Sequence, residues 1–91
     1  MRGVGLTEVV LQFSPDVAAL LRERTWHPSQ TIDELADGGL LLTVRVSDPR
    51  EMRPWIRSWG ADVEVLEPAE LRAEMAEQAR RLLDRYQAGA R

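Results

Sequence analysis

The sequence contains no cysteine, no lysine and no asparagine, and it has a single histidine. The absence of cysteine excludes a disulfide framework, a thiolate nucleophile and a cysteine-bound metal cluster. A single histidine further disfavours a metal site, so we expect neither a metal nor a cofactor. No apolar run approaches the roughly 18 residues of a membrane span, and residues 1–6 lack the apolar stretch of a signal peptide. These absences predict a cytoplasmic protein that does not enter a membrane.

The composition is that of one small globular domain. The chain has 91 residues, of which 44% are hydrophobic and 30% charged, so one core can be filled and a second cannot. We therefore treat residues 1–91 as a single domain. Its 12 basic residues, all arginine, stand against 15 acidic ones, which gives a net charge of −3. This balance disfavours a protein that binds nucleic acid over its whole surface.

The first half of the chain predicts three strands and one helix. Residues 7–13 alternate between apolar and polar positions, as a half-buried strand does. Residues 14–23 open with Ser-Pro-Asp and continue with apolar residues at helical spacing, which predicts a helix. Residues 30–35 are ambiguous, because Thr31 with Glu34 would also fit the capping box of a helix. We interpret them as a strand that an Asp-Gly-Gly turn joins in a hairpin to the clearest strand pattern, residues 40–46.

The second half predicts a helix, a strand and a long final helix. Residues 48–59 begin with Asp-Pro and carry an apolar stripe that includes two tryptophans, and a glycine follows at a position that commonly ends helices. Residues 62–66 alternate again, and Pro68 opens a helix over about residues 69–87. The order of elements is therefore β-α-β-β-α-β-α.

The first six elements form a split βαβ unit, the ferredoxin-like arrangement. We predict an α+β fold in which an antiparallel sheet has the strand order 4-1-3-2 and both helices cover one face. The ferredoxin-like core spans about residues 7–67, and the amphipathic C-terminal helix is additional to it.

Two apolar surfaces are left without a partner in this arrangement, and covering them by association would help so small a domain. One is the open face of the sheet. The other is a narrow apolar seam along the last helix, formed by Leu71, Met75, Ala79, Leu82 and Tyr86. The C-terminal helix either covers the chain's own open face or packs on a second subunit, and the sequence leaves both alternatives open. The predicted oligomer interface consists of Val10, Leu41, Met75, Leu82 and Tyr86.

Further residues are candidates for contact with a ligand or partner. Trp26 and His27 lie in a connection after the first helix, where they either meet a partner or close the core. Arg50, Arg53 and Arg57 fall on the side of their helix opposite the tryptophans. These arginines either grip phosphates or carboxylates or form a solvated face paired with Glu51 or another subunit. Arg45 adds a cation on the sheet.

Four stretches, taken together, resemble the C-terminal extension domain (WCX) of WYL-type bacterial transcription regulators. They are residues 9–13 (VVLQF), 26–30 (WHPSQ), 54–68 (PWIRSWGADVEVLEP) and the following Leu71. The resemblance spans about residues 7–83. In such regulators this domain follows a winged helix-turn-helix domain and a WYL domain, neither of which is present in this chain, so we expect either a fragment or a stand-alone remnant.

The resemblance implies a non-enzymatic domain that helps the regulator to form a homodimer. Packed against the WYL domain, it would contribute to sensing an effector, either a small molecule or single-stranded nucleic acid. An alternative is a free-standing small-ligand sensor of the ACT type, although the glycine-rich turn expected after the first strand is replaced by Ser-Pro. The lack of asparagine excludes an acylphosphatase, and the first and third strands lack the stacking aromatics of an RRM-type RNA binder.

Overall fold

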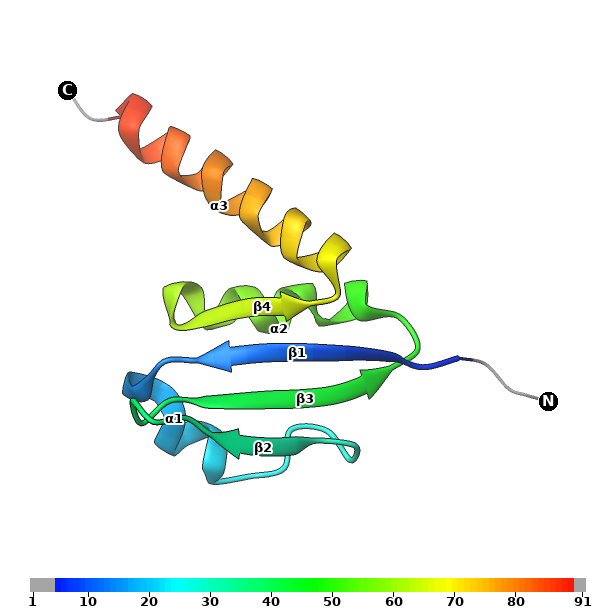
Figure 1. The fold of residues 1–91 in the computed structure, drawn as a ribbon. Coiled ribbons are helices and arrows are strands. Elements are labelled where there is room, and N and C mark those ends of the chain that lie inside the picture. Colours follow the sequence, from blue (N-terminus) through cyan, green and yellow to red (C-terminus); the bar gives the residue numbers. More distant parts are fainter. Residues whose placement is uncertain (1–4, 90–91) are drawn as a thin grey trace.

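The computed structural model describes residues 5–89 and has the predicted order of elements (Figure 1). A short 3₁₀ turn precedes α2 and another precedes β4. The elements are β1 (Thr7–Phe13), α1 (Pro15–Arg22), β2 (Thr31–Glu34), β3 (Leu40–Val46), a 3₁₀ turn (Pro49–Met52), α2 (Arg53–Ser58), a second 3₁₀ turn (Gly60–Asp62), β4 (Val63–Glu67) and α3 (Ala69–Gly89).

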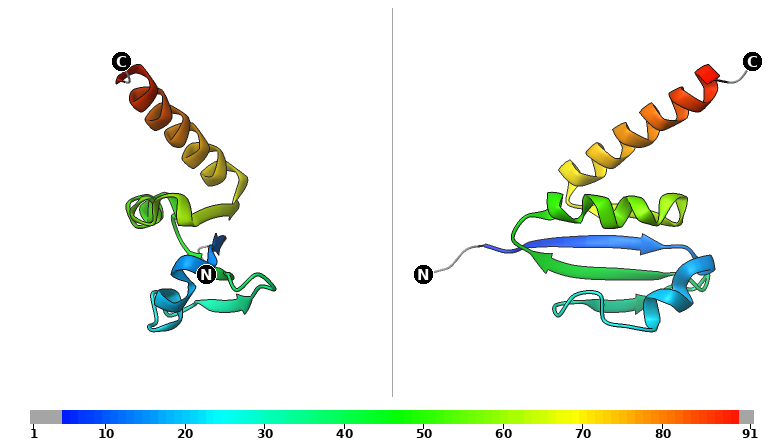
Figure 2. Two further views of the ribbon diagram at one scale, coloured as in Figure 1. Left: turned by 90° about the vertical axis from the view of Figure 1, so that its left-hand side faces the viewer. Right: turned by 180° about the vertical axis from the view of Figure 1, so that it is seen from behind.

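The four strands form one antiparallel sheet in the order β2-β3-β1-β4. The predicted order 4-1-3-2 is this order read from the other edge, so the α+β ferredoxin-like prediction is confirmed. When the sheet is viewed along its strands, α1 and α2 lie on one face and the other face carries no helix (Figure 2). Within residues 5–89, no helix has the length and apolar character that a membrane span requires.

The core lies between the sheet and the two covering helices. Alternate residues of β1 and β3 are fully buried there, as the alternation predicts. α2 and α3 close the core, each through one buried side chain. The buried residues are Val9, Leu11, Phe13, Ala18, Leu21, Leu40, Leu42, Val44, Ile56, Val65 and Leu71.

The helix predicted over residues 48–59 is interrupted near its middle. Pro54 has no N–H to donate to the carbonyl of Arg50, four residues earlier, so one continuous α-helix cannot run through it. The Arg50 carbonyl instead accepts hydrogen bonds from the backbone N–H and from Nε of Arg53. The predicted start is correct, because Asp48 caps the 3₁₀ turn through the backbone N–H of Arg50.

Ser14 occupies the N-cap position of α1 but makes no side-chain cap. Its hydroxyl donates to Oδ1 of Asp62 at 2.8 Å, and its backbone N–H donates to the carbonyl of the same residue at 2.9 Å. The start of α1 is thereby fixed to the residue that precedes β4.

The β2–β3 turn requires glycine at position 39. A Cβ at Gly39 would lie 2.5 Å from the carbonyl oxygen of Phe13, which is backbone and cannot move aside. We expect Gly39→Ala to destabilise the domain by about 1–3 kcal/mol, in the range of other overpacking substitutions. At roughly 4–8 °C per kcal/mol, thermal unfolding should show a clear fall in Tm. Gly5→Ala is the control, since a Cβ there has no neighbour within 4 Å, and an equal effect of both substitutions would contradict the prediction.

α3 leaves the end of β4 and rises away from the sheet, and it does not cover the open face (Figures 1 and 2). The molecule measures 55 × 33 × 19 Å, and its radius of gyration is 14.7 Å. A compact chain of this length would have a radius of gyration of roughly 12 Å. Of the two alternatives for the C-terminal helix, packing over the chain's own open face is not the one that the structure adopts.

Candidate interaction surface on the second and third helices

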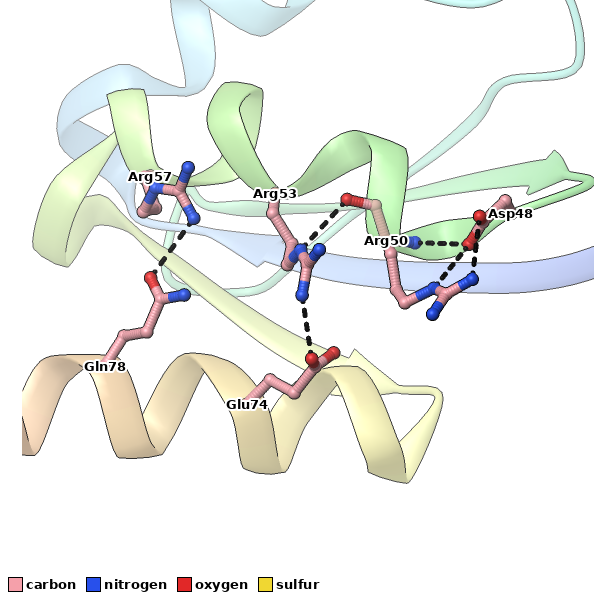
Figure 3. Close-up of polar contacts among 6 residues, drawn as sticks. All are labelled: Asp48, Arg50, Arg53, Arg57, Glu74 and Gln78. Carbon is pink, nitrogen blue, oxygen red and sulfur yellow. Dashed lines mark hydrogen bonds and ion pairs between the residues drawn. The ribbon is translucent and has the colours of Figure 1, made fainter.

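Arg50, Arg53 and Arg57, which we call the arginine row, face the first half of α3 (Figure 3). Nη1 of Arg53 lies 2.8 Å from Oε2 of Glu74, and Nη1 of Arg57 lies 3.2 Å from Oε1 of Gln78. We refer to these two contacts as the α2–α3 latch. They connect the side of α2 away from the tryptophans to the first half of α3.

The spacing of the latch residues was visible in the sequence. The two arginines are four residues apart, and so are the two acceptors, which places each pair along one side of its helix. Of the partners given above, Glu51 is not the one within the chain: Arg53 contacts Glu74, Arg57 contacts Gln78, and Arg50 contacts Asp48. Pairing with another subunit stays a prediction. Both acceptors were missed because no local rule says which helix faces α2.

The energetic contribution of the latch is small and measurable. Arg53 and Glu74 remain partly exposed, and ion pairs of this kind contribute about 0.2–1 kcal/mol. We expect a double-mutant cycle with Arg53→Gln and Glu74→Gln, read by urea denaturation, to give a coupling energy in that range. A coupling of zero would mean that the Arg53–Glu74 ion pair does not help to hold α3 on α2.

Arg50 is paired within its own turn. Its guanidinium donates to both carboxylate oxygens of Asp48, at 3.1 and 3.2 Å. This hydrogen bonding, assisted by the backbone N–H of Arg50, holds the pKa of Asp48 below its ordinary value. The turn that opens the arginine row is therefore stabilised by an ionised Asp48.

The lowered pKa of Asp48 predicts a dependence of stability on pH. Its contribution is complete above the unfolded-state pKa, near pH 4, and is lost as the pH falls through the lower folded-state pKa. Asparagine retains capping ability but has no charge. The difference in unfolding free energy between the wild type and Asp48→Asn should therefore shrink between pH 5 and pH 2 in urea titrations, and a constant difference would contradict this.

Trp55 and Trp59 lie on the core side of α2, as predicted. They form a cluster with Phe13 and Trp26 in which the ring centroids of contacting pairs are 5.4–6.0 Å apart. Nε1 of Trp26 donates to the carbonyl of Leu21 at 3.0 Å. Trp26 therefore closes the core beneath α1, which agrees with the structural alternative given for it above.

His27 is held beside Trp26 by local hydrogen bonds. Its Nδ1 accepts from the backbone N–H of Ser29 at 3.1 Å and lies 2.8 Å from the Ser29 hydroxyl. That hydroxyl also accepts from the backbone N–H of Arg45 at 2.8 Å, which ties the connection to β3. A role for His27 in binding a ligand remains a prediction.

The side chains of the candidate contact residues do not form a single cluster. Trp26 and His27 are on the tryptophan side of α2, whereas the arginine row is on its other side. Arg45 lies on the open face of the sheet, with Nε 3.8 Å from Oε2 of Glu8. The structure therefore does not bring Arg45 to the arginine row, and it does not bring the row to the Trp-His connection.

The predicted oligomer-interface residues are divided between two surfaces. Val10 and Leu41 are partly buried on the open face, among the polar side chains of Gln12 and Thr43. The three on α3 behave differently, since Met75 packs against the core whereas Leu82 and Tyr86 are exposed.

A groove of about 890 Å³ lies between the outer part of α3 and the region where α2 ends and β4 begins. Leu82, Leu83 and Tyr86 line it and are 57%, 54% and 74% exposed. The groove lining also contains residues that sequence reasoning missed, because they come from another element: Ile56, Gly60, Ala61 and Val63. Leu83 was not predicted as an interface residue because it lies beside the seam and not on it. We refer to this surface as the α3 groove.

These features define a small ferredoxin-like α+β domain with an added C-terminal helix, whose exposed apolar surface is concentrated on that helix. The family model of the WCX domain matches residues 5–83, and the chain belongs to this family. The resemblance to the WCX domain of WYL-type transcription regulators is thereby confirmed, and it assigns the chain a regulatory role in such proteins. No curated protein sequence matches the chain.

Proposed function

We propose that this chain is the dimerisation and effector-coupling domain of a WYL-type transcription regulator, with a regulatory rather than a catalytic role. One observation carries the proposal: the outer part of α3 stands clear of the core and exposes three large apolar side chains, Leu82, Leu83 and Tyr86. Contiguous apolar surface on a projecting helix is typical of an interaction site.

The outer part of α3 has little packing within the chain to stabilise it. Within residues 5–89, α3 buries one side chain, that of Leu71 in the first turn of the helix. Isolated helical segments are marginal in water, and most helical stability in proteins comes from packing of an apolar face. A partner that covers Leu82 and Tyr86 would supply this packing, which supports dimerisation.

Effector coupling is supported by the α2–α3 latch. The latch connects α2, which covers the core, to the helix that carries the proposed interface. An effector or a neighbouring WYL domain that displaced the arginines from Glu74 and Gln78 would change the direction of α3. Guanidinium groups bind phosphate well, so single-stranded nucleic acid is a suitable effector class for this row.

The first test is the oligomeric state of the 91-residue chain, measured by sedimentation velocity and light scattering. We expect a dimer at tens of micromolar. A strict monomer at that concentration would contradict the dimerisation part of the proposal.

The second test is a thermal-shift titration with short single-stranded DNA, nucleotides and small acids. A saturable rise in Tm is expected for a ligand of the folded state, and Arg53→Gln should reduce that rise. If no ligand raises Tm, the effector-coupling part of the proposal is contradicted and only the dimerisation part remains. A free-standing sensor of the ACT type would need the arginine row and the Trp-His connection to line one ligand site, and their separation by α2 gives this alternative no support.

A further inference from the structure

We propose that the α3 groove binds a small amphipathic acid, a molecule with an apolar body and one anionic head. The apolar body lies against Leu82 and Tyr86, and the head lies against Arg57, Arg81 and Arg85, all of which line the groove. The inference goes beyond the proposed function, because it gives the groove a ligand class of its own. It rests on that function in one respect, since Leu82 and Tyr86 also belong to the proposed dimer interface.

The charges that line the groove carry the inference. In the part of the chain that the structure describes, most arginines form an ion pair with a carboxylate. Those that form none are Arg24, Arg57, Arg81 and Arg85, and the last three line the α3 groove. None of the described residues that line it is acidic. In a chain with a net charge of −3, this groove is therefore complementary to an anion.

The three cations lie on one side of the groove. Nη1 of Arg57 donates to Oε1 of Gln78 at 3.2 Å, so the end of α2 meets α3 at that point (Figure 3). Arg81 and Arg85 follow Gln78 by three and seven residues, which places them on the same side of α3. Glu77, four residues before Arg81, is paired with Arg80 instead.

The guanidinium groups of Arg81 and Arg85 retain their donors for a ligand. Within residues 5–89, neither group makes a hydrogen bond or an ion pair. A guanidinium presents parallel N–H donors that match the two oxygens of a carboxylate or a phosphate. An anionic head that binds here gains charge-assisted hydrogen bonds without first breaking an ion pair of the protein.

The rest of the groove is apolar. Leu82 and Tyr86 are exposed, so a ligand that covers them removes apolar surface from water. The volume of about 890 Å³ lies within the range of roughly 300–1,000 Å³ that is common for small-ligand sites. A molecule that joins an apolar body to an anionic head uses both parts of the groove at once. The other apolar side chains that line it are Ile56, Val63, Val65, Met75 and Leu83.

Ligand binding and dimerisation compete in this arrangement. A bound acid covers Leu82 and Tyr86, which are the side chains that a second copy would cover in the proposed dimer. The ligand binds the monomer and thereby shifts the equilibrium away from the dimer. Saturating ligand should raise the dissociation constant of the dimer in sedimentation velocity.

An NMR titration of the ¹⁵N-labelled 91-residue chain with decanoate, below its critical micelle concentration, tests the inference. We expect saturable amide shifts around residues 81–86 and around Gly60, with a Kd of about 1 mM or tighter for a ligand of this size. Acetate has the head without the chain, and decylammonium has the chain with the opposite charge, so neither should saturate. Decyl phosphate shows whether a phosphate head serves as well as a carboxylate, and saturable binding of either acid supports the inference.

A charge-matched pair of variants tests the role of the arginines. Arg81→Gln with Arg85→Gln should weaken decanoate binding about tenfold, because two charge-assisted contacts are lost. Arg24→Gln with Arg80→Gln removes the same charge from positions that do not line the groove, and it should leave the affinity unchanged. Equal weakening by both pairs, or equal binding of decylammonium, would overturn the inference.

The outcomes separate this inference from the proposed function. If decanoate changes neither the amide shifts nor the dimer, the inference is overturned and dimerisation stands. If a strictly monomeric chain binds decanoate in the groove, the inference stands and the dimerisation part of the proposed function is contradicted.

Discussion

Replacing Leu82 and Tyr86 together with glutamate is expected to give folded monomers. Both side chains are exposed in the single chain, so charge there costs the monomer little. In a dimer the same changes remove two apolar anchors and bury carboxylates, and truncation of central anchors alone costs at least about 2 kcal/mol each. The dissociation constant should rise at least about 100-fold, which sedimentation equilibrium measures directly.

The matched control adds the same charge on the other side of the helix. Ala73→Glu with Gln87→Glu also introduces two carboxylates into α3, but both positions lie away from the α3 groove. This variant should dimerise like the wild type. If Leu82→Glu with Tyr86→Glu unfolds or aggregates instead, the seam is covered within the chain, and persistence of the dimer would place the interface elsewhere.

Phe13→Ala is expected to cause the largest loss of stability. Phe13 is fully buried and packs edge-on against Trp55 and Trp59, with centroids 6.0 and 5.4 Å away. Burial and cavity terms for such a truncation reach about 3–5 kcal/mol, and each aromatic pair adds about 0.5–1.5 kcal/mol. A domain of this size has roughly 5–14 kcal/mol in total, so the variant should be close to unfolding at 37 °C.

Tryptophan fluorescence during urea denaturation is a direct measurement, because all three tryptophans lie in the same cluster. Gln12→Ala is the control, since its side chain points to the open face of the same strand. It should change the unfolding free energy by less than about 0.5 kcal/mol. A loss below about 1 kcal/mol for Phe13→Ala would mean that the cluster does not support the core.

The parts of the fold that were predictable are those governed by local periodicity. The alternation in β1 and β3 correctly assigned Val9 and Leu42 to the core, because side chains of a strand point to opposite faces in turn. Local rules were insufficient where the decisive partner is distant. Ser14 has the chemistry of a cap, yet it donates to Asp62, 48 residues later.

The candidate site was only partly predictable for the same reason. The arginine row and the seam follow from helical spacing, and both exist. The partners of Arg53 and Arg57, and the groove beneath Leu82, depend on the angle at which α3 leaves β4. That angle depends on tertiary contacts, the packing of Leu71 and Met75 and the α2–α3 latch, which no single-helix pattern contains.

Anchoring at one end makes α3 a lever. Tyr86 lies about 22 Å along the helix from Leu71, and Glu74 about 4.5 Å, at 1.5 Å per residue. A rotation of about 10° around the Leu71 end moves Glu74 by about 0.8 Å but Tyr86 by about 4 Å. A sub-ångström adjustment at Arg53 is thus magnified roughly fivefold at the far tip, by the ratio of the two arm lengths. A small displacement of α3 near the sheet can in this way bring the exposed apolar surfaces of two copies together or move them apart.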